Sequence, residues 1–414
     1  MCCLATAAVC LSPTFTWAQE VGQRSDSLEL EVRLLKERLD SLEQILRRLA
    51  SQGEDTVEVV DELAALRAAA RAVAPEEPAD TAPTHFIMRS RNLSGYNPEI
   101  SVTGDVRVSG NRPGPQQNNV DVREFSVGFQ SALDPYSNTK VFFSFGEEGV
   151  EIEEAYAYWT GLPGGLRLDV GRFRQQLGEL NRWHLHAMPE TEYPLVLREY
   201  FGEGGLAGNG LGLFWVAPVT TIGGAVHEFW AQTTLGDNEV LFEDGNRLSI
   251  LGHVNNFWQV SRSTFFQLGA TGVYGENPDV GLETSVLGAD FRLTWRPPHR
   301  VIYQSFTLRG EGFAVRKRTA GVGESRYGGY LGTTYQASRR VHFGARFDYV
   351  EPLVGTGEHI WAFVPQFTFW QSEWVFLKAE WQHQSEPLFV GRETSDRFVI
   401  QVVWSIGPHK HESY

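Results

Sequence analysis

Opposite charges recur two residues apart in six separate stretches of the sequence. The pairs are Asp105/Arg107, Arg167/Asp169, Asp290/Arg292, Arg309/Glu311, Arg346/Asp348 and Lys378/Glu380. Residues i and i+2 lie on the same face of a β-strand, so each pair would meet the same solvent. With Glu124 and Lys140, which lie in stretches of the same rhythm, the set holds seven bases and seven acids. Such a wall could line a water-filled pore for ions or polar solutes.

A second group of chemically capable side chains lies between residues 180 and 198. These candidates for a constriction loop are Arg182, His184, His186, Glu190, Glu192 and Arg198. The two histidines, with the two glutamates, could also bind a divalent metal, although hydrogen bonding within the loop is the commoner outcome for such residues. No Ser/His/Asp set or carboxylate pair has a spacing typical of catalysis, so we expect neither enzymatic activity nor a cofactor.

The elements that carry the charge pairs have a period of two residues. Phe291, Leu293 and Trp295, for example, alternate with Asp290, Arg292 and Thr294. Seven turn signals separate eight such hairpins, at 134–138, 162–165, 217–221, 261–264, 296–300, 337–340 and 371–373. The pattern predicts an all-β fold of sixteen antiparallel strands, with longer connections at the opposite end. The longest of these spans roughly residues 175–209.

A membrane barrel and a soluble β-sandwich both show this alternation, but the strand length favours the barrel. Ten residues that rise ~3.3 Å each and tilt by about 45° cover ~23 Å, close to the ~25 Å apolar band of an outer-membrane barrel. Tryptophans gather at the predicted strand ends, as side chains at a lipid headgroup interface do. No run of 18 apolar residues follows the N-terminus, so the sequence predicts no spanning helix.

The region before the barrel has a different composition. Residues 1–18 resemble an export signal that is cleaved after Ala18, with a lipoprotein signal at Cys10 as the alternative. All three cysteines lie in this segment, so the exported chain would contain no disulfide. Residues 19–73 carry leucines at alternating spacings of four and three, which predicts a periplasmic coiled coil or an amphipathic helix on its own chain. A linker (74–96), the barrel (97–406) and a tail (407–414) follow.

Two short motifs resemble the phosphate-selective porin O and P family. They are Gly171-Arg-Phe-Arg-Gln-Gln-Leu-Gly178 and the glycine-rich segment Glu199–Leu213. The resemblance implies a sixteen-stranded trimeric barrel, a third loop that folds inward and an exported N-terminal coiled coil. This chain has no Arg- or Lys-rich third loop, so the resemblance does not extend to phosphate selectivity. The last strand, which ends at Trp404, resembles the terminal assembly signal of outer-membrane proteins.

These features predict a homotrimeric porin in the outer membrane of a Gram-negative-type bacterium, in contact with lipid and open to small hydrophilic solutes or ions. The net charge of −15 argues against nucleic acid as a partner. The alternatives are a blocked barrel that tethers the envelope through a cell-wall-binding coiled coil, a metal- or anion-specific uptake channel, and a barrel enzyme. The wall charges either form layers, with acids nearer the exterior than bases, or pair across neighbouring strands.

Overall fold

The computed structural model describes residues 98–407, apart from 114–118, 147–148, 219–223, 237, 244–246, 278–281, 320–321, 355–357 and 389–390. The expected export signal, coiled coil and linker lie outside the described residues, as does the tail after Gly407. No helix within the described ranges has both the length and the apolar character needed to cross a membrane.

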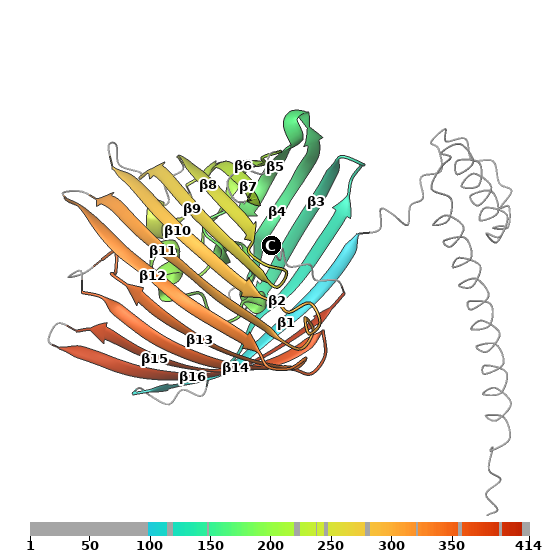
Figure 1. Cartoon of the computed structure of the whole chain (residues 1–414). Coiled ribbons are helices and arrows are strands. Elements are labelled where there is room, and N and C mark those ends of the chain that lie inside the picture. Colours follow the sequence, from blue (N-terminus) through green and yellow to red (C-terminus); the bar gives the residue numbers. More distant parts are fainter. Residues whose placement is uncertain are drawn as a thin grey trace, which may run out of the picture. The chain divides into compact units, whose positions relative to one another are not determined.

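Sixteen antiparallel strands form one closed barrel, which confirms the expected fold class. Each strand pairs with its neighbours in the chain, and β1 pairs with β16 to close the ring. Figure 1 shows the strands wrapping obliquely around this ring. Their bounds are β1 Glu99–Arg112, β2 Asn119–Ala132, β3 Ser137–Gly146, β4 Gly149–Leu162, β5 Leu166–Arg174, β6 Ala207–Val216, β7 Val226–Leu235, β8 Leu248–Gln259, β9 Thr264–Glu276, β10 Glu283–Trp295, β11 Ser305–Thr319, β12 Val322–Gln336, β13 Val341–Val350, β14 Ile360–Trp370, β15 Val375–Pro387 and β16 Arg392–Ile406.

The seven expected turns all join an even-numbered strand to the next odd-numbered strand. The turn between β2 and β3 is closed by Asp134, whose Oδ1 accepts hydrogen bonds from the backbone N–H groups of Tyr136 and Ser137 at 2.8 Å each. Between β4 and β5, Gly164 and Gly165 adopt positive φ angles of 78° and 76°. The connections at the other end of the barrel include the longest one, residues 175–206, as expected.

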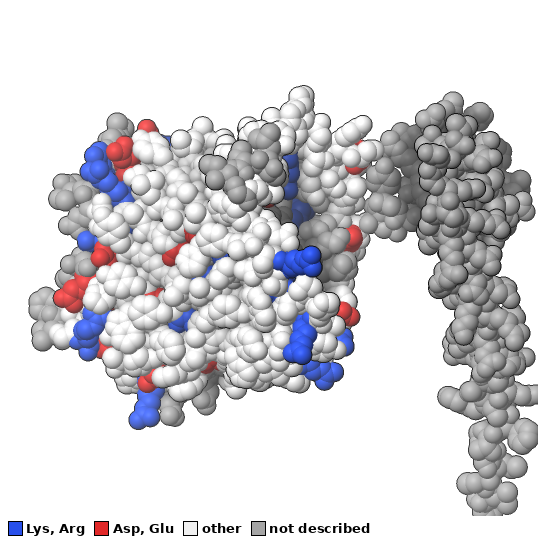
Figure 2. Space-filling model, viewed as in Figure 1, with Lys and Arg blue, Asp and Glu red and all other residues white. Residues whose placement is uncertain are grey.

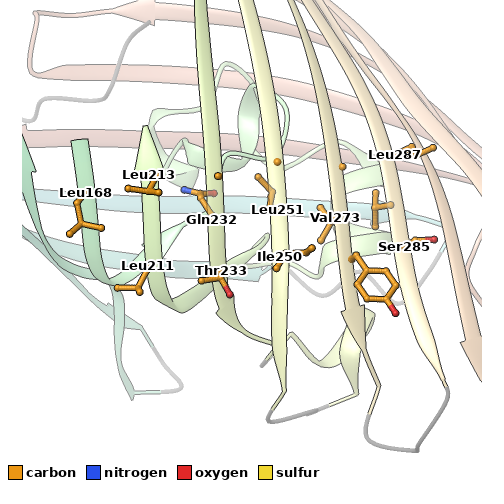
Figure 3. Close-up of a pocket in the computed structure, with 15 residues that line it drawn as sticks. Leu168, Leu211, Leu213, Gln232, Thr233, Ile250, Leu251, Val273, Ser285 and Leu287 are labelled. Carbon is orange, nitrogen blue, oxygen red and sulfur yellow. The ribbon is translucent and has the colours of Figure 1, made fainter. Parts of the chain in front are cut away.

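The outer face of the barrel carries the apolar members of the alternation. Leu287 and Ile250, for example, are 70% and 57% exposed. The face shown in Figure 2 is mostly uncharged across its middle. An apolar depression of about 700 Å³ lies over β5–β10. Figure 3 shows residues that line it, including Leu168, Leu213 and Leu287. Gly252 and Gly272 have no side chain to fill the space between the larger residues. An apolar exterior of this kind suits contact with hydrocarbon.

Two β-bulges interrupt the alternation on the inner face. The register between β1 and β2 shifts after the Asp105–Glu124 pair, and Arg123 is the extra residue. The register between β3 and β4 shifts in the same way, with Glu153 as the extra residue. A bulge lets two consecutive side chains reach one face of a sheet. Arg123 and Glu153 thereby join Glu124 and Glu154 on the inside of the barrel.

Residues 175–206, called the inner loop below, supply about half of the buried apolar cluster. The inner loop contains the short 3-10 helices η3 (Leu180–Arg182) and η4 (Leu185–Ala187) and the helix α3 (Leu195–Phe201), which the sequence did not predict. Its apolar side chains are buried with residues of β11–β14 and of α4 (Glu239–Phe242). The members of this cluster include Leu177, Val196, Tyr200, Phe201, Phe242, Phe313, Val315, Tyr330, Val350 and Val364. The inner loop therefore packs inside the barrel.

Candidate functional site

Two histidines of the inner loop contact carboxylates on β2 and β4. The Nδ1 and Nε2 atoms of His184 lie 2.8 and 3.2 Å from carboxylate oxygens of Glu153 and Glu154. His186 contacts Glu124 through Nδ1. Burial lowers the pKa of His184, but the hydrogen bonds and charges of the two glutamates outweigh it, so this pKa lies above its ordinary value. With an acceptor at each ring nitrogen, His184 is held as the charged imidazolium.

The same part of the wall supplies the counter-charges for these glutamates. Arg174, at the end of β5, donates from Nη2 to Glu153 at 2.8 Å and from Nη1 to the hydroxyl of Tyr193 at 3.0 Å. Lys140 lies 3.0 Å from Glu154. Both cations are buried. The wall and the inner loop thus form one alternating network of acids and bases.

A metal site at the two histidines finds no support in this geometry. Their ring nitrogens face carboxylates on separate strands, and the described part of the chain contains no group of three or more His, Cys, Asp or Glu side chains placed to hold a metal ion. The sequence predicted that the two histidines would form hydrogen bonds within the loop, and this prediction is wrong about the partners. The hydrogen bonds of His184 and His186 run to the barrel wall, because both imidazole rings are buried against it.

Glu192 connects the inner loop to the strands that close the barrel. Its carboxylate contacts Arg107 on β1 at 3.1 Å, Arg397 on β16 and Arg198 on α3. Burial raises the pKa of Glu192, but the charges of Arg198, Arg397 and Arg107 outweigh it and lower this pKa to about 2. The carboxylate is therefore ionised at neutral pH and balances three guanidinium groups.

Residues 188–192 are held by the strands β13 and β15. Lys378 donates from Nζ to the backbone carbonyls of Met188 and Glu190 at 2.8 and 3.0 Å. Glu380 accepts hydrogen bonds from the backbone N–H and the hydroxyl of Thr191 at 2.9 and 2.8 Å. Arg346 donates to the backbone carbonyl of Glu192 at 3.0 Å. Two of the predicted wall pairs thus bind the backbone of the inner loop.

The beginning of the inner loop contacts β10 and β11. Arg292 lies 3.1 Å from Glu179, and Glu311 accepts a hydrogen bond from the backbone N–H of Leu180 at 2.9 Å. The guanidinium of Arg182 lies 5.2 Å from the centre of the Trp230 ring on β7. These contacts fix the start of the inner loop against the opposite side of the wall from the two histidines.

The fourteen predicted wall residues are all buried or half-buried. Eleven are fully buried, namely Asp105, Glu124, Lys140, Asp169, Asp290, Arg309, Glu311, Arg346, Asp348, Lys378 and Glu380. Arg107, Arg167 and Arg292 are half-buried. Groups that faced an open aqueous channel would retain more exposure. The inner loop therefore fills much of the lumen at the level of these charges.

The wall charges pair in three different ways. Arg167 and Asp169 pair within β5 at 2.6 Å, and Arg346 pairs with Asp348 within β13 at 2.9 Å. Lys140 pairs across strands with Glu154, and other charges bind the inner loop. Like charges lie side by side on β10 and β11, where Asp290 is the cross-strand partner of Glu311 and Arg292 that of Arg309. This part of the wall has the layered order, with an acidic level next to a basic one.

Sequence reasoning missed several residues of the network. Glu153 and Glu154 are not among the predicted wall residues, but both are buried, whereas the neighbouring Glu151 is exposed. Alternation counted back from the buried Tyr156 identifies Glu154 as an inner residue. No such count finds Glu153, or Arg123 on β2, because each is the extra residue of a bulge. Other missed residues include Asp121, Arg174, Glu179, Trp183, Tyr193 and Arg397.

Solved structures of outer-membrane porins and channels have a fold similar to that of this barrel. An anion-selective porin from Comamonas acidovorans has a TM-score of 0.53 at 9% identity, over 75% of this chain and 99% of that chain. The outer-membrane channel DcaP of Acinetobacter baumannii has a TM-score of 0.53 at 10% identity, over 75% and 96%. Salmonella typhi OmpF, in complex with daunomycin, has a TM-score of 0.51 at 9% identity, over 76% and 99%. The fold is that of a porin.

The sequence comparison with curated proteins covers only part of this chain. An uncharacterised protein of Aquifex aeolicus (strain VF5) is 37% identical over 113 residues, which are 27% of this chain. The match spans about a fifth of that relative, 22% of its length. No known family profile matches the sequence. The comparisons thus show a porin fold, and they do not confirm the narrower resemblance to phosphate-selective porins.

Proposed function

We propose that this chain forms an outer-membrane channel through which small hydrophilic solutes or ions diffuse passively, with no enzymatic step and no cofactor. The observation that supports this function best is the difference in polarity between the two faces of the barrel wall. Its outer face is apolar, as at Leu287 and Ile250, whereas its inner face carries paired acids and bases. An aqueous path inside a hydrocarbon-facing wall needs this arrangement.

The inner loop is the proposed constriction. It contacts the wall at β2–β4, at the seam between β1 and β16, at β13–β15 and at β10–β11. Because most of the wall charges at its level are buried, we expect a narrow path and a small single-channel conductance. The balanced acids and bases favour weak selectivity between small cations and anions.

We further propose that three copies assemble in the outer membrane of a Gram-negative-type bacterium, with the N-terminal segment in the periplasm. The leucines between Leu28 and Leu49 support this arrangement, because their alternating spacings of four and three suit a seam between helices of different copies. Chemical crosslinking of the purified protein, with and without residues 19–73, tests it. A monomer in both samples would contradict the proposal.

A barrel that only anchors an envelope tether is the second candidate. The observation in its favour is the tight packing of the inner loop, in which His186 and Glu190 are each 1% exposed. Such a barrel would pass little or no current.

Planar-bilayer recording of the purified protein separates the two functions. Discrete conductance steps that scale with salt concentration support the channel. Membranes that contain correctly folded protein and stay electrically silent would refute it and favour the anchor. A hydrolase screen on the same preparation tests the enzyme alternative, and turnover there would contradict the non-catalytic assignment.

A further inference from the structure

A second cavity lies inside the barrel, between the inner loop and the end with the short turns. Its volume is about 310 Å³, within the range of small-molecule sites. The floor is formed by the ends of β8–β11, and Trp183 of the inner loop forms part of its lining. Phe257 and Phe265 contribute stacked rings whose centres are 5.8 Å apart. Both the inner loop and the wall therefore contribute flat apolar surfaces to this cavity.

The charges around this cavity are unbalanced. Three arginines and one acid line it, namely Arg292, Arg296, Arg309 and Glu179, which leaves two positive charges in excess. Glu179 is already paired with Arg292 at 3.1 Å. Arg296 is exposed at the end of the barrel with the short turns. The excess charge favours an anion over a cation or a neutral solute.

The buried guanidinium of Arg309 lacks hydrogen-bond acceptors for two of its nitrogen atoms among the described residues. Its side chain is 5% exposed, and its Nε and Nη1 atoms have no hydrogen-bond partner among the described residues. Its Nη2 atom makes one long contact of 3.5 Å, to the hydroxyl of Thr334. The guanidinium also lies 5.9 Å from the centre of the Trp183 ring. A buried guanidinium without acceptors is costly, and a bound carboxylate would supply them.

We propose that this cavity, termed the arginine–aromatic cavity, binds a small organic anion with a flat apolar body, such as an aromatic carboxylate. The carboxylate lies beside Arg309 and its cross-strand partner Arg292, and the ring lies against Trp183, Phe257 and Phe265. The proposal deepens the channel function and depends on it for delivery of the solute. Binding itself can be measured without any current.

Calorimetric titration of the full-length protein in detergent with benzoate tests the proposal. Acetate, which lacks the ring, and benzyl alcohol, which lacks the charge, are the ligand controls. We expect benzoate to bind on the order of tenfold more tightly than either, since both the ion pair and the ring contact contribute. Equal binding of acetate and benzoate, or no heat from benzoate, would overturn the proposal.

Two variants locate the binding site. We expect R309Q to weaken benzoate binding by on the order of tenfold. R316Q is the matched control, because it makes the same change on the same strand at an exposed position on the other face. W183L tests the ring contact without altering a strand, so it keeps the test informative if R309Q fails to fold. Unchanged binding in either folded variant would place the site elsewhere and refute this assignment.

The result is separable from the channel proposal. A protein that conducts but does not bind benzoate retains its function and loses this cavity as a ligand site. A protein that binds benzoate and never conducts retains the ligand site, and the channel proposal fails.

Discussion

Replacement of Glu192 by glutamine is expected to loosen the inner loop from the seam of the barrel. Glu192 is the only acid whose contacts join Arg107 on β1, Arg397 on β16 and Arg198 on α3 within the described part of the chain. Glutamine keeps the size of the side chain and removes its charge. Three guanidinium groups then face one another without their shared carboxylate.

The magnitude follows from the pKa of Glu192, which lies at about 2 compared with an ordinary 4.5. The difference of about 2.5 units corresponds to about 3 kcal/mol, at 1.36 kcal/mol per unit. The Glu192 side chain is 16% exposed and that of Arg198 is 30% exposed, so water screens part of this interaction. We therefore expect a loss of about 1–3 kcal/mol in the free energy that holds the loop at the seam. This contribution is complete above pH 4.5 and disappears as the pH falls towards 2.

Bilayer recording at neutral pH measures the consequence. The E192Q channel should show a larger and noisier conductance than the unmodified protein. In a potassium chloride gradient its reversal potential should move towards that of chloride, because the lumen gains one net positive charge. E276Q is the matched control, since Glu276 is an exposed rim residue that pairs only with Arg247 among the described contacts.

Identical conductance and reversal potential in E192Q and the unmodified protein would refute this reasoning. That result would mean that the contacts at β2–β4 and β13–β15 hold the inner loop without help from the seam.

The remaining predictions concern the histidine contact, a buried arginine and the outer face. The pKa of His184 is raised, so its pairing with Glu153 and Glu154 stabilises the loop fully below about pH 6.5. This stabilisation is lost as the pH rises through the higher pKa of the folded state. The conductance should grow over that pH window, and the conductance of H184Q should not depend on pH there. R174M should lower the unfolding free energy by about 3–5 kcal/mol, since it leaves the buried Glu153 without its arginine partner. Denaturant titration monitored by gel mobility would show this loss, and a change below about 1 kcal/mol would contradict the network. L287R should lower the free energy of unfolding in a membrane by about 2–4 kcal/mol, because Leu287 is expected to face hydrocarbon. The folding yield of L287R in lipid vesicles should therefore fall, while L287A folds normally. Equal yields would argue against a lipid-facing surface.

Much of the wall could be predicted from the sequence. The period of two residues and the turn signals identified all sixteen strands, because successive side chains of a strand point to opposite faces and each face contacts a different environment. The same rule placed the charge pairs, such as Arg346/Asp348 and Lys378/Glu380, on the inner face. These are local properties that each strand carries in its own residues.

The sequence could not predict the partners of those charges. Arg123 and Glu153 break the alternation because the bulges that turn them inward arise from the pairing of two strands. Nothing in residues 180–198 indicates which wall residues His184 or Glu192 will contact, since the partners lie up to 205 positions away in the chain. Only closure of the ring brings β1, β16 and the inner loop together.

The sequence by itself thus determined the strands, their inward and outward faces and the existence of a long third connection. The tertiary structure decided that this connection packs into the lumen, that its histidines contact carboxylates of the wall, and that Arg309 and Trp183 line a cavity beside it. The reason is physical: alternation responds to the solvent beside each residue, whereas ion pairs and cavities depend on distances between segments that the closed barrel alone fixes.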